Sequence, residues 1–151
     1  MNPPLRTWQD VQAIKEGLRD GTIDVIATDH APHATQEKQQ GFTEAPFGIV
    51  GLETALSLTL ALVEEGILSL ESAIEKLSAA PARAFGLSKG TLTVGADADV
   101  AIIDPQAHWE VDPGKFRSKS RNTPFAGWKV KGLVVTTIVG GRVVFEAPVP
   151  A

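Results

Sequence analysis

The segment from Thr22 to His33 constrains the fold more than any other part of this sequence. Its first half, residues 23–28, is rich in apolar, β-branched side chains that fall on both faces of an extended chain. Such a run predicts a short buried strand, because a strand with one face in water alternates polar and apolar residues. Pro32 cannot donate a hydrogen bond to a sheet, so the strand is expected to end near Asp29.

Asp29, His30 and His33 are therefore expected at the carboxyl end of a buried strand. Catalytic groups of open α/β sheets and of α/β barrels lie at this end of the strands. An Asp-His-x-x-His pattern on its own is equally typical of a turn with an Asx cap and two surface histidines. The buried strand that precedes it favours the functional interpretation.

Around this strand, the first 87 residues follow a helical period. Thr7 and Asp10 predict the start of a helix that carries an apolar stripe and ends at Gly21. A helix before a strand indicates an α/β layer, and with no strand before the helix the sequence has the character of a segment from the middle of a fold. The polar residues 34–48 predict a lid-like loop without structure of its own, or else a solvated insertion.

Two further helices are expected before the period changes. Residues 51–65 carry a wide apolar stripe that suits packing against a sheet, and Gly66 should end this helix. Ser69 should cap the next helix, Pro81 should break it, and a short turn should end at Gly86.

After Leu87 the apolar period changes from 3.6 to 2, which predicts a domain boundary between residues 1–87 and residues 88–151. Gly140–Gly141 predicts a two-residue hairpin turn. The sequence predicts strands at 91–94, at 100–103 (stopped by Asp104–Pro105), at 108–111, at 133–139 and at 142–145, with a basic loop at 112–127 and a frayed tail at 148–151.

Composition excludes some classes of function. A net charge of −4 argues against nucleic-acid binding, and the absence of cysteine excludes disulfides and thiolate metal ligands, which is compatible with the cytoplasm. The first six residues lack the apolar core of a signal peptide, and the most apolar run, residues 56–63, is too short to span a membrane.

A complete zinc site cannot be built from the residues around the strand end. Catalytic zinc usually takes three protein ligands and a water. Of the three histidines, His108 lies in the β-rich half and is expected to be structural or on the surface. Asp29, His30 and His33 are too close in sequence to converge readily on one ion. Either no metal binds, or most of its ligands lie elsewhere.

Five sequence blocks carry a resemblance to a known family: Asn2-Pro-Pro-Leu-Arg6, Ile26-Ala-Thr-Asp-His-Ala-Pro-His33, Pro46-Phe-Gly-Ile-Val-Gly-Leu-Glu53, Gly90-Thr-Leu-Thr-Val-Gly-Ala-Asp-Ala-Asp-Val100 and Arg121-Asn-Thr-Pro-Phe-Ala-Gly-Trp128. Together they resemble the C-terminal portion of the dihydroorotase family, which belongs to the amidohydrolase superfamily. Their order and spacing extend the resemblance over essentially the whole sequence. The resemblance implies an α/β fold: the end of strand 7 to helix 8 of a (β/α)₈ TIM barrel, followed by part of a small β-sandwich.

The same resemblance implies an activity and the residues that perform it. Dihydroorotases reversibly hydrolyse the cyclic amide of dihydroorotate to N-carbamoyl-L-aspartate in de novo synthesis of pyrimidines (UMP), with one or two zinc ions. Asp29 matches the catalytic aspartate, which binds a metal and carries a proton between the attacking hydroxide and the ring nitrogen. Asn2, His33 and the Phe47–Gly48 backbone match substrate-binding positions. His30 matches no family ligand and is expected to support or pack against the site.

The sequence lacks the family's His-x-His-x-Arg block, its bridging residue and its two later metal histidines, so this chain is expected to need the missing N-terminal part and to be inactive alone. Two other readings stay open: a non-catalytic structural partner of aspartate transcarbamoylase, and a related cyclic amidohydrolase of the allantoinase or dihydropyrimidinase type. Asn2, Asp29 and His33 favour the enzyme, and His33 suits a substrate carboxylate that neutral rings lack. A homodimer or an association with aspartate transcarbamoylase is compatible with the resemblance; a nucleic acid or a membrane is not expected as a partner.

Overall fold

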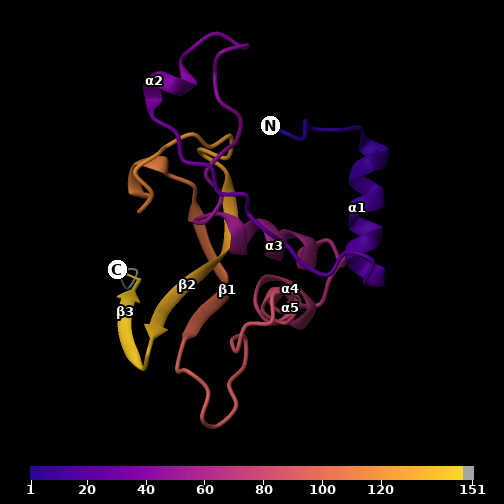
Figure 1. Ribbon diagram of the computed structural model, residues 1–151, viewed down its shortest axis with the longest axis vertical. Helices are drawn as coiled ribbons and strands as arrows, with labels where there is room; N and C mark the ends of the chain where they lie inside the picture. Colours follow the sequence, from indigo (N-terminus) through magenta and orange to yellow (C-terminus); the bar gives the residue numbers. More distant parts are fainter. Residues whose placement is uncertain (148–151) are drawn as a thin grey trace.

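The structure, a computed structural model, describes residues 1–147, so the tail expected to fray at 148–151 lies outside the described residues. Helices and a small antiparallel sheet lie side by side, and a long loop carrying α2 extends away from both (Figure 1). The elements are α1 (Trp8–Asp20), α2 (Thr35–Lys38), α3 (Ala55–Glu64), α4 (Leu70–Leu77), α5 (Ala79–Ala84), β1 (Val100–Glu110), the 3₁₀ turn η1 (Pro113–Lys115), β2 (Lys129–Val139) and β3 (Arg142–Glu146).

α1 begins and ends where the sequence predicts. The backbone N–H and the hydroxyl of Thr7 each donate to Asp10 at 2.8 Å, and the Asp10 N–H donates back to the Thr7 hydroxyl at 3.3 Å. Gly21 closes the helix with φ 85°, a conformation that costs glycine little. Only the C-terminal part of the apolar stripe is covered, because Leu18 is buried while Ile14 is 55% exposed.

α3, α4 and α5 follow the prediction only in part. α3 begins at Ala55 after a turn at 52–54, not at residue 51. Ser69 caps α4 as expected, accepting a hydrogen bond from the Ser72 N–H at 3.1 Å. Pro81 lies within the first turn of α5, and α4 ends at Leu77, the residue whose carbonyl the proline ring would contact in a continuous helix.

The prediction of a buried strand at 23–28 is wrong for this chain. Residues 24–34 form neither helix nor strand, and the apolar side chains of the run are only half-buried. A strand needs a neighbour, and here the backbone bonds to helices instead: the Ile23 N–H donates to the Gly17 carbonyl at 2.8 Å and the Ile26 N–H to the Lys76 carbonyl at 3.0 Å. The Lys76 ammonium also donates to the Ile23 carbonyl, so the end of α4 holds this segment in place.

The sheet has the order β1-β2-β3, all antiparallel. The predicted hairpin is confirmed, with φ of 55° and 75° at Gly140 and Gly141, both in the left-handed region that a two-residue turn of this kind requires. β2 begins at Lys129, earlier than predicted.

Two strand predictions need correction. Asp104–Pro105 does not stop β1, which runs on to Glu110 with a register irregularity between Asp104 and His108. Proline is tolerated at such an irregularity because no ladder hydrogen bond is required there. Residues 91–94 are not a strand, and Leu92 is 80% exposed, because no strand of the described chain lies beside them.

α3 packs directly on β2, so the helical part and the sheet share an interface. At Gly132, φ is 93° and a Cβ would overlap the side chain of Leu60. The Ser57 hydroxyl donates to the Gly132 carbonyl at 2.8 Å, and the Trp109 indole N–H donates to the same carbonyl at 2.9 Å. The absence of a side chain at Gly132 thus allows the helix to approach the strand closely.

Six of the buried apolar residues form two clusters. One joins Leu18 of α1 to Leu68 and Ala73 beside and within α4. The other consists of Val50, Val111 and Phe116, and it supports the loop that precedes α3. Within residues 1–147, no helix is both long and apolar enough to cross a membrane. The described chain thus combines helices with a three-stranded antiparallel sheet.

Candidate active site

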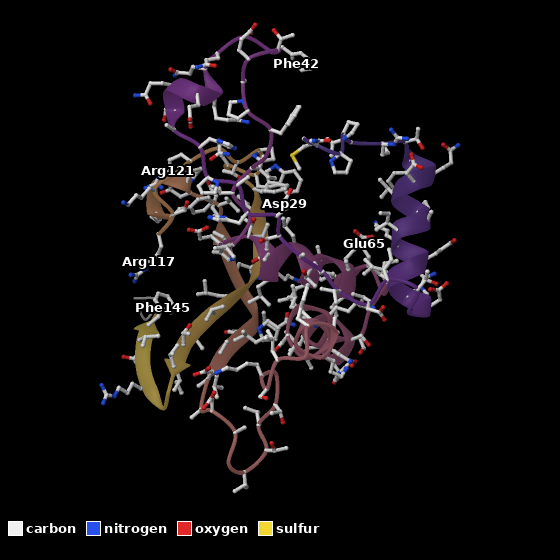
Figure 2. All side chains as sticks on the ribbon, in the orientation of Figure 1. Asp29, Phe42, Glu65, Arg117, Arg121 and Phe145 are labelled. Atoms are coloured by element: carbon white, nitrogen blue, oxygen red, sulfur yellow. The ribbon has the colours of Figure 1, made fainter. Side chains whose placement is uncertain are left out.

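Asp29 has an unusual backbone conformation. Its φ is 45°, and among residues 1–147 it is the one non-glycine residue with positive φ. Aspartate adopts this region more readily than most L-residues, but it still costs conformational energy. Figure 2 shows Asp29 near the middle of the molecule, above α3, and its side chain is exposed. The surrounding chain must therefore hold this backbone in place.

His30 provides part of that support. Its Nδ1 accepts hydrogen bonds from the N–H groups of Gly51, at 3.0 Å, and Leu52, at 3.3 Å. The neutral ring therefore carries its proton on Nε2, since an accepting nitrogen holds no hydrogen. A Cβ on Gly51 would lie 3.0 Å from the carbonyl oxygen of Thr28. The backbone on both sides of Asp29 is thus fixed against the turn that precedes α3.

His33 contacts the far end of the long loop. Its Nε2 lies 2.7 Å from the Phe47 carbonyl oxygen, and its Nδ1 lies 3.8 Å from Glu37 Oε2. Gly48 is buried with φ 97°, and the side chain of Ala31 occupies the place where its Cβ would be. Three of the residues expected in the site, His33, Phe47 and Gly48, are therefore adjacent in the structure.

Asn122 completes this arrangement, and the sequence analysis did not identify it. Its Nδ2 donates to the carbonyls of Ala31, at 2.9 Å, and Gly48, at 3.2 Å. Its Oδ1 accepts a long hydrogen bond of 3.4 Å from the His33 N–H, and its own carbonyl accepts from the Val50 N–H at 3.1 Å. An asparagine before Thr-Pro in a loop is an ordinary turn residue. The signal that could have found it is its place in the block Arg121–Trp128, which resembles the family but was given no role.

The long loop, residues 34–48, was expected to have no secondary structure of its own, but it contains the one-turn helix α2. The Lys38 ammonium donates to the carbonyls of Pro46, at 2.8 Å, and Gly48, at 3.2 Å, which ties the two ends of the loop together. The tip around Phe42 extends away from the rest of the molecule and is fully exposed (Figure 2).

Asn2 is exposed and lies in the segment before α1, which has no regular structure. Among the described residues, no hydrogen bond joins it to the network around His33. His108 is exposed on β1, opposite Lys131, away from the other two histidines.

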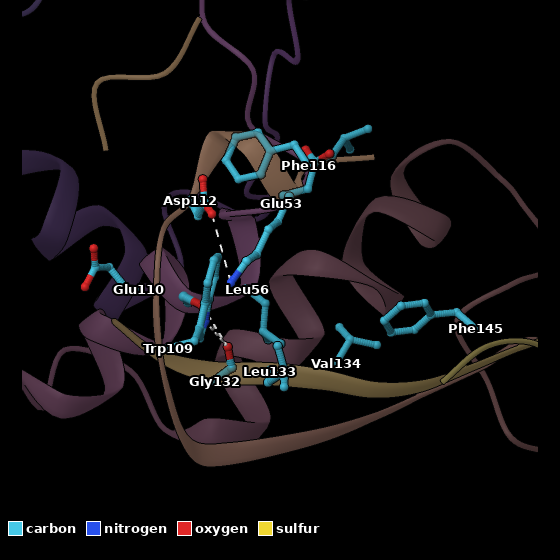
Figure 3. A pocket seen from close by; sticks show the side chains of 13 residues that line it. Glu53, Leu56, Trp109, Glu110, Asp112, Phe116, Gly132, Leu133, Val134 and Phe145 are labelled. Atoms are coloured by element: carbon cyan, nitrogen blue, oxygen red, sulfur yellow. Dashed lines mark hydrogen bonds and ion pairs between the residues drawn. The ribbon is translucent and has the colours of Figure 1, made fainter. Parts of the chain in front are cut away.

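A mostly apolar hollow lies between α3 and the sheet (Figure 3). Its lining includes Leu56, Trp109 and Phe145, and also Glu53. Glu53 Oε1 accepts from the Ser118 N–H at 2.8 Å, whereas its buried Oε2 has no hydrogen-bond partner in the described part of the chain. Asp29 and His33 do not line this hollow, so it is separate from the candidate active site.

The donor set of this chain does not fit a zinc ion on its own. Within residues 1–147, no three His, Cys, Asp or Glu side chains are grouped closely enough to hold a metal. His30 Nδ1 and His33 Nε2 are engaged with backbone groups, which leaves the Asp29 carboxylate and His33 Nδ1 as donors between residues 29 and 33. Two donors are too few for a catalytic zinc site, which usually takes three protein ligands.

The sequence defines the class of protein: the chain belongs to the amidohydrolase family, whose model matches residues 5–144. Among curated proteins, it is 58% identical over 146 residues to the dihydroorotase of Geobacter metallireducens, covering 97% of this chain and 34% of that protein. It is 51% identical over 146 residues to the dihydroorotase of Syntrophus aciditrophicus, with the same coverage. The resemblance to dihydroorotases is thus confirmed, and the chain spans about a third of the length of these relatives.

Solved structures of related enzymes share the fold of this chain over nearly its whole length. L-hydantoinase (dihydropyrimidinase) from Arthrobacter aurescens matches with a TM-score of 0.87 and 40% identity, over 95% of this chain and 33% of that chain. D-hydantoinase (dihydropyrimidinase) from Thermus sp. matches with a TM-score of 0.88 and 31% identity, over 97% of this chain and 33% of that chain. The present chain therefore corresponds to an α/β segment of a larger amidohydrolase.

Proposed function

We propose that this chain is the C-terminal third of a dihydroorotase, which reversibly hydrolyses dihydroorotate to N-carbamoyl-L-aspartate in pyrimidine biosynthesis. The observation that carries the proposal is the identity of 58% to a dihydroorotase over nearly the whole chain. The adjacency of His33, Phe47 and Gly48 beside Asp29 supports it, since these residues were assigned to the site from the sequence blocks alone.

In this proposal, residues 1–87 contribute the end of strand 7 to helix 8 of a TIM barrel, and residues 88–151 contribute to a β-sandwich. Two features support it. The apolar segment 23–28 lacks a partner strand, and it would gain one from the preceding strand of a barrel. The exposed apolar side chains of Leu92 and Val94 would likewise be covered by further strands of a sandwich.

Asp29 is the residue that moves the proton. An ionised carboxylate can accept a proton from the attacking water and return it to the ring nitrogen as the amide bond breaks. The anchored backbone on either side of Asp29 limits the positions that this carboxylate can reach. Asp29 is also the one metal ligand that we assign to this chain, and the remaining ligands would come from the rest of a full-length enzyme.

His33 and the loop end bind the substrate. With Nε2–H donating to the Phe47 carbonyl, a protonated His33 can donate its Nδ1–H to the carboxylate of dihydroorotate, which would compete with Glu37, whose Oε2 lies 3.8 Å from Nδ1. The Phe47–Gly48 backbone closes over the pyrimidine ring, and Asn2 adds a side-chain amide. Gly48 suits this position because the loop comes too close to Ala31 for any side chain.

A dihydropyrimidinase activity is the second candidate, favoured by the 40% identity to the L-hydantoinase structure. The two activities differ in the charge of the ring substrate, since dihydroorotate carries a carboxylate and dihydrouracil does not. His33 favours the charged substrate. A non-catalytic partner of aspartate transcarbamoylase has no chemical need for Asp29, His33 and Asn2 together.

The test is a graft. The 146 matching residues of the Geobacter metallireducens dihydroorotase are replaced by the matching part of this chain, and the product is called the grafted enzyme below. We expect turnover of both dihydroorotate and N-carbamoylaspartate, and little turnover of dihydrouracil. A well-folded graft that neither hydrolyses dihydroorotate nor cyclises N-carbamoylaspartate would overturn the proposal, and a preference for dihydrouracil would establish the second candidate.

A further inference from the structure

We infer that Asn122 is a positioning residue that sets the distance between His33 and the Phe47–Gly48 loop end. The inference rests on the proposed function, because it concerns the same substrate site. Asn122 belongs to the loop between η1 and β2, so it reaches the site from the sheet side of the molecule.

The hydrogen bonds of Asn122 join two separate segments. Its Nδ2 has two hydrogens, and one is donated to Ala31, beside His33, while the other is donated to Gly48. The two carbonyls belong to stretches of chain that run next to each other, since the Ala31 N–H donates to the Ile49 carbonyl at 2.9 Å. The side-chain amide thus bridges the two segments and adds two hydrogen bonds to the direct contacts between them.

The chemistry of an amide is required at this position. An amide can donate twice and accept once, which matches the two carbonyls and the His33 N–H. Aspartate has the same shape but would place carboxylate oxygen against the carbonyls of Ala31 and Gly48. Alanine would remove both donations. The Gly48 carbonyl would keep Lys38 as a donor, whereas the half-buried Ala31 carbonyl would lose its hydrogen bond to Asn122, and leaving such an acceptor without a partner is costly.

The loop that carries Asn122 is itself held in place, as a positioning role requires. Its backbone carbonyl accepts the Val50 N–H at 3.1 Å, and Ser118 in the same loop donates to Glu53 at 2.8 Å. Phe116 and Phe125 anchor the loop in the second buried cluster. These contacts connect the loop before β2 to the segment of Val50 and Glu53, which directly follows the Phe47–Gly48 loop end.

The experiment compares two variants of the grafted enzyme with a matched control. Asn122→Asp and Asn122→Ala remove the two donations. Thr123→Ala, in the neighbouring position, removes a hydrogen bond internal to the loop, from the Phe125 N–H to the Thr123 hydroxyl at 3.3 Å. This control reports how much a weakened loop by itself changes the enzyme.

We expect Asn122→Asp to raise KM for dihydroorotate by about 10- to 100-fold, the effect of misplacing binding groups by about an ångström, with a smaller fall in kcat. Thr123→Ala should leave KM within about twofold of the unmutated graft, well under the ~1.4 kcal/mol of a tenfold change. A KM for Asn122→Asp equal to that of the control, or a KM for the control raised as strongly, would overturn the inference.

A second measurement separates this inference from the proposed function. Hydrogen exchange of the Ala31 and Val50 amides in the grafted enzyme should become faster in Asn122→Asp than in Thr123→Ala, whether or not the graft turns over substrate. Equal exchange in the two variants overturns the positioning role. An inactive unmutated graft with faster exchange in Asn122→Asp overturns the proposed function and leaves the structural coupling established.

Discussion

At the scale of single residues, the site depends on how its backbone is anchored. Asp29 has a positive φ, and this conformation persists because Thr28 and His30 on either side are held against Gly51 and Leu52. Backbone strain of this kind is found where a functional group must be held in one place.

Asp29→Asn in the grafted enzyme should abolish turnover while leaving KM nearly unchanged. The amide keeps the shape of the side chain but cannot accept the proton, and loss of general acid–base catalysis costs about 10²- to 10⁴-fold in rate. Steady-state kinetics with dihydroorotate measures this. If Asp29→Asn kept a kcat near that of the unmutated graft, Asp29 would not be the proton carrier.

His30 allows a comparison of two variants, because asparagine can supply a hydrogen-bond acceptor at the position of its Nδ1 and alanine cannot. The Oδ1 of Asn in His30→Asn lies where Nδ1 lies now, so it can still accept from Gly51 and Leu52. We expect His30→Ala to lower kcat by about 10- to 100-fold, as loss of a supporting residue does, and His30→Asn to restore most of it. Equal losses in both variants would show that the imidazole has a role beyond accepting these hydrogen bonds.

At the scale of elements, α1 is defined by its N-terminal cap. Hydrogen bonds from the side chain and then the backbone of Thr7 hold the pKa of the Asp10 carboxyl below its ordinary value of 3.8. A pKa lowered by folding stabilises the fold above the unfolded-state pKa, and that stabilisation is lost as the pH falls through the folded-state pKa. The cap should therefore weaken only under acidic conditions.

Thr7→Ala should raise the pKa of Asp10 towards its ordinary value, because the hydroxyl donor is lost and the backbone donor remains. It should also destabilise the helix by about 1 kcal/mol at neutral pH, the usual cost of losing a threonine N-cap. Carboxyl chemical shifts followed over pH give the first quantity, and denaturant unfolding gives the second. An unchanged Asp10 pKa would contradict the capping geometry.

At the scale of the whole molecule, apolar surface is left uncovered. Leu5, Trp8, Val11 and Ile14 are exposed on and before α1, and Leu92 and Val94 are exposed beyond α5. Patches of this kind on a soluble domain mark surfaces that normally meet another part of a protein.

The isolated chain should therefore bind an apolar dye, self-associate and show no turnover of dihydroorotate, even with added Zn²⁺. The grafted enzyme, in which these surfaces are covered, should be dye-silent and active. Dye fluorescence, sedimentation and a turnover assay of the two proteins side by side provide the comparison. Turnover by the isolated chain above a zinc-only control would contradict the need for further metal ligands.

Local features of this protein followed from its sequence, because the groups involved are neighbours along the chain. Thr7 with Asp10, Ser69 with Ser72 and the Gly140–Gly141 turn each depend on contacts within a few residues. The motif at Asp29 to His33 was assigned to a site from its resemblance to the dihydroorotase family, since the pattern alone is equally typical of a turn, and that assignment stays a proposal.

Only the tertiary structure decided how distant segments meet. Residues 23–28 have the composition of a strand, yet pairing depends on a neighbouring strand, and their N–H groups bond to Gly17 and Lys76 instead. Asn122 is 91 residues from Ala31, and although it lies in the block Arg121–Trp128 that resembles the family, nothing in that block says which segment its side chain contacts. Its role arises because packing of the loop against Val50 and Glu53 brings one amide between two backbone carbonyls.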